Sequence, residues 1–323
     1  MKLLEEIELQ PVKSLKGKHL LSLIDYTSEE VKQLVDLAIK MKIVTKESGS
    51  PKLLDGKTLA MIFEKNSTRT RVSFEVGMHQ LGGKGMYMNA RDLQIGRGET
   101  VHDTALVLSG YVDGIMIRAN EHTMVEELAT YSKVPVINGL TDVSHPCQAL
   151  ADLETIAEVK GSFEGLKVAY IGDGNNVAHS LVAACAHVGM DSVIAAPVGY
   201  EPDPAIIAKV QQIAAANGAT VTVTTDPVEA VKDADVIYSD VWTSMGQEEE
   251  SAKRLKDFAD YQINEALVAH AKPDYIFLHC LPAHREEEVT TGVIDNQEHS
   301  YIFHQAENRM HAQKAVLVSL LAD

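Results

Sequence analysis

The sequence has little positive charge, few cysteines and no long apolar run. Its 323 residues contain 29 Lys and Arg against 46 Asp and Glu, which gives a net charge of −17. This acidic balance argues against nucleic acid or an anionic membrane as the main partner. No apolar run approaches the roughly 20 residues that a transmembrane helix needs. The few arginines must therefore serve a small anion or local structure.

The cysteines and the N-terminus exclude further classes of protein. The three cysteines, Cys147, Cys185 and Cys280, form no Cys-x-x-Cys pair, so neither a disulfide framework nor a zinc ribbon is implied. The first six residues are partly acidic and lack the layout of a signal peptide, and they disfavour a mitochondrial presequence. We therefore expect a cytoplasmic globular protein.

Strand and helix patterns alternate along the chain and predict an α/β fold of two domains. Each domain is expected to be a mostly parallel sheet covered by helices, with long helices joining the two, at 1–150 and 151–304. A helix at about 305–323 should complete the first domain. Apolar strand-like runs occur at 58–63, 84–88, 112–117 and 134–138, and then at 166–171, 192–196, 219–224, 235–239 and 275–279. A helix beginning at a capping box, 27–30, precedes them, and one over about 146–160 separates the two series.

A donor-rich stretch, Ser67-Thr68-Arg69-Thr70-Arg71, follows the first of these strands and opens a helix. The first N–H groups of a helix have no partner within the helix, and the helix dipole adds partial positive charge there. With two guanidinium groups and three hydroxyls, this predicts a phosphate site. The alternative is that Ser67 only caps the helix and both arginines face solvent.

Further polar groups stand where other predicted strands end, at the edge where open α/β sheets bind ligands. Arg118 ends an apolar strand, and an arginine there is costly unless it is paired or binds an anion. His145 and Gln148 share a face at the start of the 146–160 helix, although His145 could be a lone capping residue. The Gly172–Asn176 turn has only a partial dinucleotide pattern, because Val177 occupies the third glycine position.

Two more strand ends carry a carboxylate and a thiol, Asp240 and Cys280. A nucleophilic cysteine needs a base beside it, and His279 is expected to alternate to the other face of the strand. Cys280 is therefore either a nucleophile or a hydrogen-bonding group. The polar 89–99 loop, which includes Gln94, is expected to be a mobile surface turn.

Together these motifs resemble the carbamoyltransferase family. The resemblance rests on Ser67–Arg71, His145-Pro146-Cys147-Gln148 and His279-Cys280-Leu281-Pro282, and it extends over nearly the whole chain. With Asp240 and Ser244-Met245-Gly246, it is to the ornithine-specific members. Aspartate-specific members carry a threonine in the His-Pro motif and lack the cysteine. Members that act on putrescine, agmatine or N-acetylornithine lack the Ser-Met-Gly loop and remain alternatives.

The resemblance implies carbamoyl transfer from carbamoyl phosphate to L-ornithine in arginine metabolism, without a cofactor, a metal or a covalent enzyme intermediate. The first domain would bind carbamoyl phosphate and the second ornithine. Arg118, His145, Asp240 and Cys280 would be catalytic. Carbamoyl phosphate would contact Ser67, Thr68, Arg69, Thr70, Gln94, Arg118, His145, Gln148, Cys280, Leu281 and Arg309. Ornithine would contact Asn176, Asp240, Ser244 and Met245, and Lys65 and Arg71 would play supporting roles.

The same resemblance implies a homotrimer, or a multiple of trimers, in which Gln94 enters the neighbouring subunit's site. That role would replace the surface-turn interpretation of the 89–99 loop. Two other classes remain as alternatives. One is a nucleotide-dependent oxidoreductase that uses the 171–177 turn, and the other is a catalytically silent anion-binding paralogue.

Overall fold

The computed structural model describes residues 7–244 and 248–322, which form two compact units. Unit 1 contains the described residues up to Glu154 and those from Glu307 onward, and unit 2 contains Thr155–Ala306. The sequence placed the corresponding changes at 150/151 and 304/305. Among the described helices, none combines the length and the hydropathy that crossing a membrane requires.

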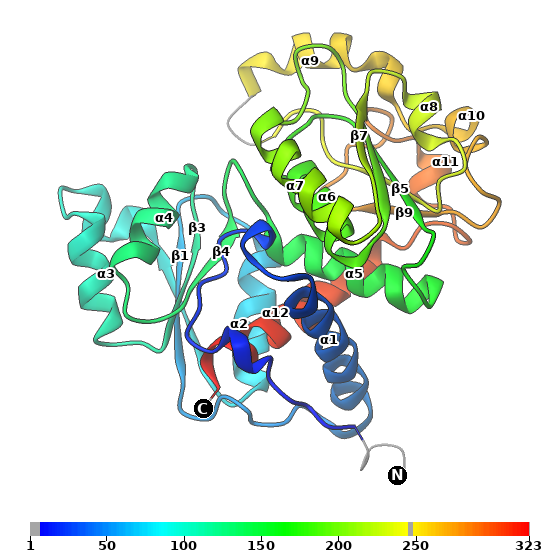
Figure 1. The fold of residues 1–323 in the computed structure, drawn as a ribbon. Helices are drawn as coiled ribbons and strands as arrows, with labels where there is room; N and C mark the ends of the chain where they lie inside the picture. Colours follow the sequence, from blue (N-terminus) through cyan, green and yellow to red (C-terminus); the bar gives the residue numbers. More distant parts are fainter. Residues whose placement is uncertain (1–6, 245–247, 323) are drawn as a thin grey trace. The chain divides into compact units, whose positions relative to one another are not determined.

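Unit 1 is built on a four-stranded parallel sheet with strand order β2-β1-β3-β4 (Figure 1). The central strands β1 and β3 are buried almost throughout, as expected for a parallel sheet with helices on both faces. The predicted parallel α/β architecture is therefore confirmed in this unit. The strands are β1 (Thr58–Phe63), β2 (Lys84–Asn89), β3 (Gly114–Arg118) and β4 (Val136–Leu140).

Helices cover both faces of this sheet. Figure 1 shows α3 and α4 on one face and α1, α2 and α12 on the other. On the first face, alternate strand residues such as Ile62 and Ile115 pack against Leu108 and Leu128. These helices are α1 (Ser28–Ser48), α2 (Thr68–Gln80), α3 (Val101–Ser109), α4 (His122–Tyr131) and α12 (Ile302–Leu321), and α5 (Pro146–Lys160) runs from unit 1 into unit 2.

The predicted capping box at the start of α1 is confirmed. The Thr27 side chain accepts a hydrogen bond from the Glu30 backbone N–H, and the Glu30 side chain accepts one from the Thr27 backbone N–H.

The structure also contains short 3-10 helices, which are η1 (Lys13–Leu15), η2 (Leu23–Asp25), η3 (Ala90–Asp92), η4 (Gln94–Gly96), η5 (Glu248–Glu250) and η6 (Ala259–Tyr261).

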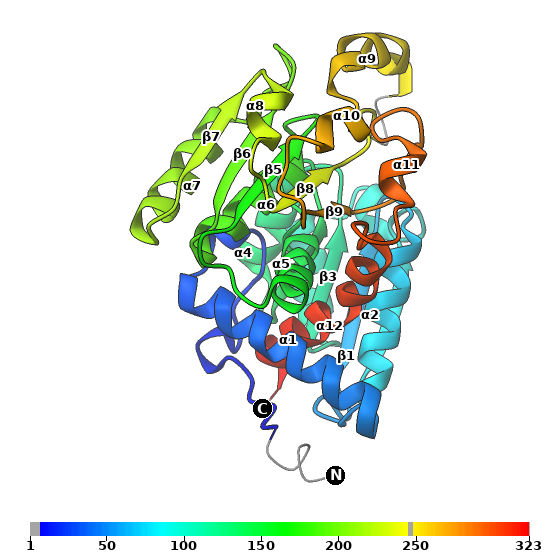
Figure 2. The same ribbon diagram turned by 90° about the vertical axis from the view of Figure 1, so that its right-hand side faces the viewer.

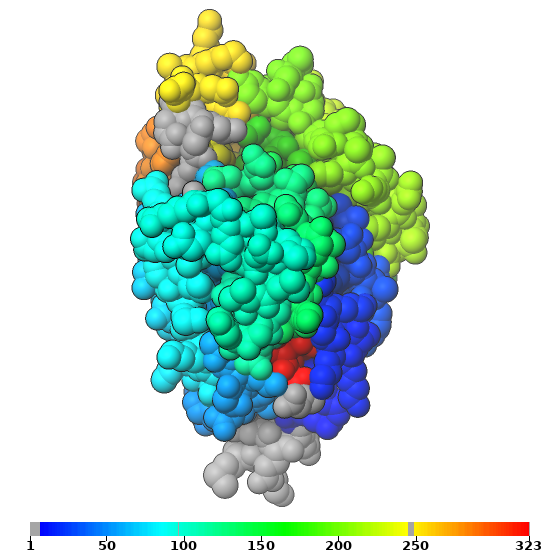
Figure 3. All heavy atoms as spheres, turned by 90° about the vertical axis from the view of Figure 1, so that its left-hand side faces the viewer, coloured from blue at the N-terminus to red at the C-terminus, as the bar shows by residue number. Residues whose placement is uncertain are grey.

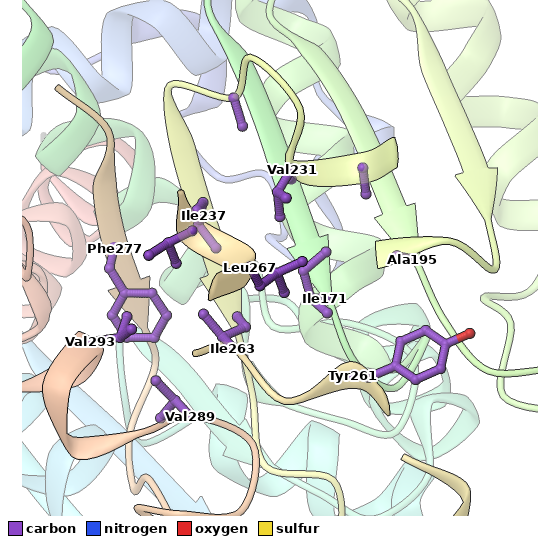
Figure 4. Close-up of a cluster of buried hydrophobic side chains, with 14 of the residues drawn as sticks. Ile171, Ala195, Val231, Ile237, Tyr261, Ile263, Leu267, Phe277, Val289 and Val293 are labelled. Carbon is purple, nitrogen blue, oxygen red and sulfur yellow. The ribbon is translucent and has the colours of Figure 1, made fainter. Parts of the chain in front are cut away.

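Unit 2 contains a five-stranded parallel sheet with strand order β7-β6-β5-β8-β9 (Figure 2). Its strands are β5 (Lys167–Ile171), β6 (Asp191–Ala195), β7 (Val221–Thr224), β8 (Val236–Ser239) and β9 (Ile276–His279). The helices are α6 (Asn176–Val188), α7 (Pro204–Ala216), α8 (Pro227–Val231), α9 (Ser251–Asp257), α10 (Glu265–Val268) and α11 (Thr291–Ile294). On one face, Ile171, Ile237 and Phe277 pack against Leu267 and Val293 (Figure 4).

Each sheet has one point at which the strand order reverses. In unit 1 the chain goes from β1 outward to β2 and then returns to β3, so the reversal lies between β1 and β3. In unit 2 it lies between β5 and β8. Ligands of open α/β sheets bind outside the carboxyl ends of the strands at such points. The fold therefore indicates one candidate binding position in each unit.

Candidate functional site

The candidate anion site of unit 1 begins at the N-terminus of α2, directly after β1. The Ser67 hydroxyl accepts a hydrogen bond from the Thr70 N–H at 3.2 Å and donates to the Thr70 hydroxyl at 3.1 Å. The capping interpretation of Ser67 is therefore confirmed, and the cap also orients Thr70. Thr70 is buried, whereas Thr68 is exposed and Arg69 is partly buried.

Arg71 lies apart from this group. Its guanidinium stacks on the Tyr87 ring, 3.8 Å from the ring centroid, and its Nε lies 3.5 Å from a Glu75 carboxylate oxygen. The side chain is exposed. The two arginines of the motif thus differ, because Arg71 faces solvent as the capping interpretation expected for both.

Arg309 on α12 joins this site from a distant part of the sequence. It is buried, and its Nη1 donates to the Gln148 side-chain oxygen at 2.7 Å. Its Nη2 lies 3.5 Å from the Thr70 hydroxyl oxygen. The guanidinium therefore connects the start of α2 to the start of α5, as the grouping of these residues in the sequence analysis required.

His145, which directly precedes α5, is held in its neutral form. Burial is the largest cause that lowers its pKa well below the ordinary value, and the next is repulsion from three nearby guanidinium groups, those of Arg309, Arg118 and Arg69. Arg309 Nη1 lies 3.5 Å from His145 Nε2. Because a guanidinium can only donate, Nε2 is the acceptor in this contact. Three positive charges thus surround one neutral imidazole.

The position of Arg118 follows from the sheet. It is the last residue of β3 and pairs in register with Phe63, the last residue of β1, so it stands at the strand reversal of unit 1. Arg118 is also buried. A buried guanidinium near two others is costly unless anions compensate the charge. The site therefore favours a ligand with more than one negative charge.

Asp152 is a member of this cluster that the sequence analysis missed. It is fully buried, and its carboxylate accepts a hydrogen bond from the Gln148 side-chain amide at 2.8 Å. The contact determines the orientation of the Gln148 amide, so that its oxygen faces Arg309 and its nitrogen faces Asp152. The i, i+4 spacing of Gln148 and Asp152 on a predicted helix was the available signal.

The candidate site of unit 2 stands at the reversal between β5 and β8. Asp240 follows β8, and one carboxylate oxygen accepts from the Asn175 side-chain amide at 2.9 Å. The other accepts from the Cys280 thiol at 3.0 Å, and Cys280 follows the neighbouring strand β9. Asn175 also caps α6 through the backbone N–H groups of Val177 and Ala178. Three strand ends are thus connected through one carboxylate.

His279 is closer to this group than strand alternation predicted. A ring nitrogen of His279, the Cys280 thiol and an Asp240 carboxylate oxygen lie within 4.8 Å of one another, and this combination of groups could ligate a metal. However, both ring nitrogens have protein partners, the Leu281 N–H and a Glu288 carboxylate oxygen. His279 is therefore not the hydrogen-bond partner of the thiol, which donates to Asp240 instead.

The glycine turn after β5 has a packing explanation. A Cβ on Gly174 would lie 2.2 Å from the Pro202 backbone nitrogen, so the chain at Pro202 leaves no room for any other residue. Gly172 has a φ of 144°, which other residues rarely adopt. The two glycines thus serve the fold locally, which weakens the dinucleotide-binding alternative.

The remaining predicted site residues are placed by their element and their burial. Asn176 is the first residue of α6 and is partly buried, as is Ser244, and Met245 lies outside the described residues. Gln94 is exposed on η4. In Figure 3, the segment coloured cyan, which includes this loop, lies at the surface. The surface-turn interpretation of the 89–99 loop therefore fits this single chain.

Family models match both parts of the chain. Residues 18–158 match the carbamoyl-P binding domain of the aspartate/ornithine carbamoyltransferases, and residues 164–320 match their Asp/Orn binding domain. The first range contains His145 with Arg69 and Arg118, and the second contains Asp240, Cys280 and the third arginine of the cluster, Arg309.

Individual relatives agree with these models. The chain is 63% identical to the ornithine carbamoyltransferase of Anoxybacillus flavithermus over 95% of its own length and 98% of the relative, and 61% identical to that of Bacillus subtilis over 95% of each. The solved ornithine carbamoyltransferase of Pyrococcus furiosus is 59% identical, with a TM-score of 0.92 over 95% of this chain and 98% of that one. The chain therefore belongs to the aspartate/ornithine carbamoyltransferase family of transferases.

Proposed function

We propose that the protein transfers the carbamoyl group of carbamoyl phosphate to the side-chain amine of L-ornithine, giving L-citrulline and phosphate. The observation that carries the proposal is the convergence of Arg69, Arg118 and Arg309 on the neutral His145. Such a cluster fits a small dianion whose reactive end needs uncharged and cationic hydrogen-bond donors. The names of the relatives support ornithine as the acceptor.

We assign the phosphate group to the N-terminus of α2. Ser67, Thr68, Arg69 and Thr70 would contact the phosphate oxygens, with the helix dipole adding to the attraction. Arg118, His145, Gln148 and Arg309 would contact the carbamoyl end, and Leu281 and Cys280 would approach the same group. Lys65 and Arg71 would support the site without contacting the ligand.

The reaction proposed is direct attack of the neutral amine on the carbonyl carbon. A new C–N bond forms and the carbonyl oxygen becomes an oxyanion. The C=O bond then re-forms as the C–O bond to phosphate breaks, and the proton lost by the nitrogen goes to the departing phosphate. Donors from Thr70, Arg118 and His145 would stabilise the oxyanion, and one such donor is typically worth about 3 kcal/mol. An alkylammonium group has a pKa of about 10.4, and the same cations favour its neutral form.

The acceptor amino acid is assigned to unit 2. Asp240 and Ser244 would bind its α-amino group, and Asn176 and the Met245 backbone its carboxylate. Asp240 suits this role because it is a buried carboxylate already oriented by Asn175 and Cys280. Under this assignment, the free amino acid should be preferred over amines that lack these groups.

We further propose a homotrimer, or a multiple of trimers, in which Gln94 completes the neighbouring subunit's site. Two observations support self-association. Gln94 is exposed in its own chain, and β2, an edge strand, borders a groove of about 430 Å³ that is lined by Val72, Glu75, Val76, His79, Lys84 and two glycines. Val72 and Met86, both large and apolar, are also exposed in this chain.

We also propose a cytoplasmic role in arginine synthesis. One relative, from Pyrococcus furiosus, is named as an anabolic ornithine carbamoyltransferase, which supports this direction.

The substrate assignment predicts a clear preference among amines. Product formation should be measured with ornithine, putrescine, agmatine and N-acetylornithine at a fixed concentration of carbamoyl phosphate. Ornithine should exceed the others in kcat/KM by at least about 100-fold, because their binding leaves buried polar groups unpaired. A larger value for any of the other three amines would overturn the assignment.

The role of Cys280 gives a second prediction. Cys280→Ser should retain measurable turnover, with a loss of about tenfold, because a serine hydroxyl can also donate to Asp240. Mass spectrometry of the wild-type protein after mixing with carbamoyl phosphate should find no carbamoyl-cysteine. A trapped adduct that forms and decays at the rate of turnover would replace direct attack with a covalent mechanism.

A further inference from the structure

The side chain of Glu288 is an unexplained buried carboxylate in unit 2. It is fully buried, as is the His279 ring whose Nε2 lies 3.1 Å from Glu288 Oε1. The same oxygen accepts the His284 backbone N–H at 2.7 Å. Among the described residues, the other oxygen, Oε2, has no hydrogen-bond partner. A buried charged group is costly, and an apolar residue of similar size is often tolerated as well or better. Stability alone therefore does not explain a glutamate at this position.

The hydrogen bonds of His279 determine where its proton lies. The Leu281 backbone N–H donates to Nδ1 at 2.9 Å, so Nδ1 must be an acceptor. In the neutral ring the proton is then on Nε2, which donates to Glu288. The opposite tautomer would place two donors face to face at Leu281 and two acceptors face to face at Glu288. Glu288 thus selects the tautomer that holds the Leu281 backbone.

The backbone at Leu281 needs such support. Its φ is 58°, in the left-handed region that residues with a branched side chain rarely adopt. The preceding residue is Cys280, whose thiol donates to Asp240. The His279 backbone is held as well, because its N–H donates to the Gln305 side chain at 2.9 Å. The His279 ring, which directly precedes the Cys280–Leu281 segment, thus helps to hold the conformation of that segment.

We propose that Glu288 is a positioning residue of the ornithine site: through the His279 imidazole, it holds the Cys280–Leu281 segment so that the thiol meets Asp240. The proposal rests on the assignment of Cys280 and Asp240 to substrate binding made above. Glu288 itself touches no substrate. Its effect falls mainly on the acceptor half of the reaction, because the carbamoyl end keeps its assigned contacts to Arg118, His145, Gln148 and Arg309.

The test compares Glu288→Leu, Glu288→Gln and a matched control, Glu287→Leu. Glu287 is the preceding residue and is less buried, and its carboxylate lies 3.4 Å from the exposed His284 ring. A glutamine can keep both hydrogen bonds through its oxygen, whereas leucine keeps neither. The first readout is the rate at which iodoacetamide alkylates Cys280, followed by peptide mass spectrometry. Cys147 and Cys185 are buried, and burial raises the pKa of the Cys147 thiol to about 12, so both serve as internal references.

Iodoacetamide should alkylate Cys280 roughly tenfold faster in Glu288→Leu than in the wild type, because the thiol is released from Asp240. The rates in Glu288→Gln and Glu287→Leu should match that of the wild type. The second readout is kinetic. The KM for ornithine should rise roughly tenfold in Glu288→Leu, and the KM for carbamoyl phosphate should rise less, because that ligand keeps its other assigned contacts. The proposal would be overturned if Cys280 in a folded Glu288→Leu protein were alkylated at the wild-type rate, or if the KM values for ornithine and carbamoyl phosphate rose equally.

The alkylation readout does not depend on activity. If the wild-type protein failed to carbamoylate ornithine, the proposed function would fail, while the alkylation series would still report whether Glu288 positions Cys280. Should Glu288→Leu not fold, His279→Asn and His279→Gln replace it. Asparagine can mimic Nδ1 and accept from Leu281, whereas glutamine mimics only Nε2. Faster alkylation in the Gln variant alone supports the proposal, and equal rates in the two variants contradict it.

Discussion

Arg69→Ala is expected to lower kcat/KM for carbamoyl phosphate by about 100- to 1,000-fold while leaving the fold intact. The substitution removes a cation from the N-terminus of α2, where the ligand phosphate is assigned, and a donor to a developing charge is worth about 3–4 kcal/mol. The helix itself keeps its cap, because the Ser67 hydroxyl and the Thr70 N–H are unchanged. Steady-state kinetics with circular dichroism would measure both effects.

Arg71→Ala provides the matched control. Arg71 belongs to the same motif but stacks on Tyr87 and lies near Glu75 at the surface, so its loss should change kcat/KM by less than about threefold. Arg69→Lys should fall between, because an ammonium keeps the charge but not the two-pronged geometry of a guanidinium. Near-wild-type turnover in Arg69→Ala, or an equal loss in Arg71→Ala, would show that the phosphate lies elsewhere.

Mixing an inactive Arg69→Ala protein with an inactive Gln94→Ala protein is expected to restore activity. In a trimer with shared sites, a site is complete when its own chain supplies Arg69 and its neighbour supplies Gln94. Random exchange at equal amounts makes about a quarter of the sites complete. Activity should therefore rise from the level of either variant to about a quarter of wild type.

The control for this experiment mixes Arg69→Ala with Arg118→Ala. Both residues belong to the same chain's site, so every site in the mixed assembly lacks one of them and no activity should return. Subunit exchange is verified by native mass spectrometry of differently tagged chains. Failure of the Gln94 mixture after verified exchange, or recovery in the Arg118 mixture, would contradict the proposed sharing.

Local patterns predicted much of the fold and part of the candidate site. The expected strands lie within a few residues of those in the structure, because apolar runs bounded by turn residues reflect burial in a parallel sheet. The capping box of α1 and the start of α5 at Pro146 also follow from adjacent residues. Each of these features depends on interactions within a few positions of the chain.

Contacts between distant strand ends could not be predicted in the same way. The sequence offers no reason to pair Asn175 with Asp240, since their proximity follows from the neighbouring positions of β5 and β8 in the sheet. His279 was not expected to lie beside the thiol as a base, and its ring contacts the Leu281 N–H and Glu288 instead, but the left-handed turn at Leu281 that allows the first contact has no signal in the sequence. Glu288 carries no local signal, because its partner lies across that turn.

The two-piece construction of unit 1 has a consequence for biosynthesis. Residues up to Glu154 and from Glu307 onward belong to one compact unit, so the whole of unit 2 is translated between them. Domains usually fold as units, the N-terminal one first, as the chain leaves the ribosome. Here Arg309, which reaches Gln148 and Thr70, emerges only after all of unit 2. A nascent chain therefore cannot complete its arginine cluster until Arg309 has been synthesised. Only a chain whose synthesis has continued beyond unit 2 can bind the anion with the complete cluster.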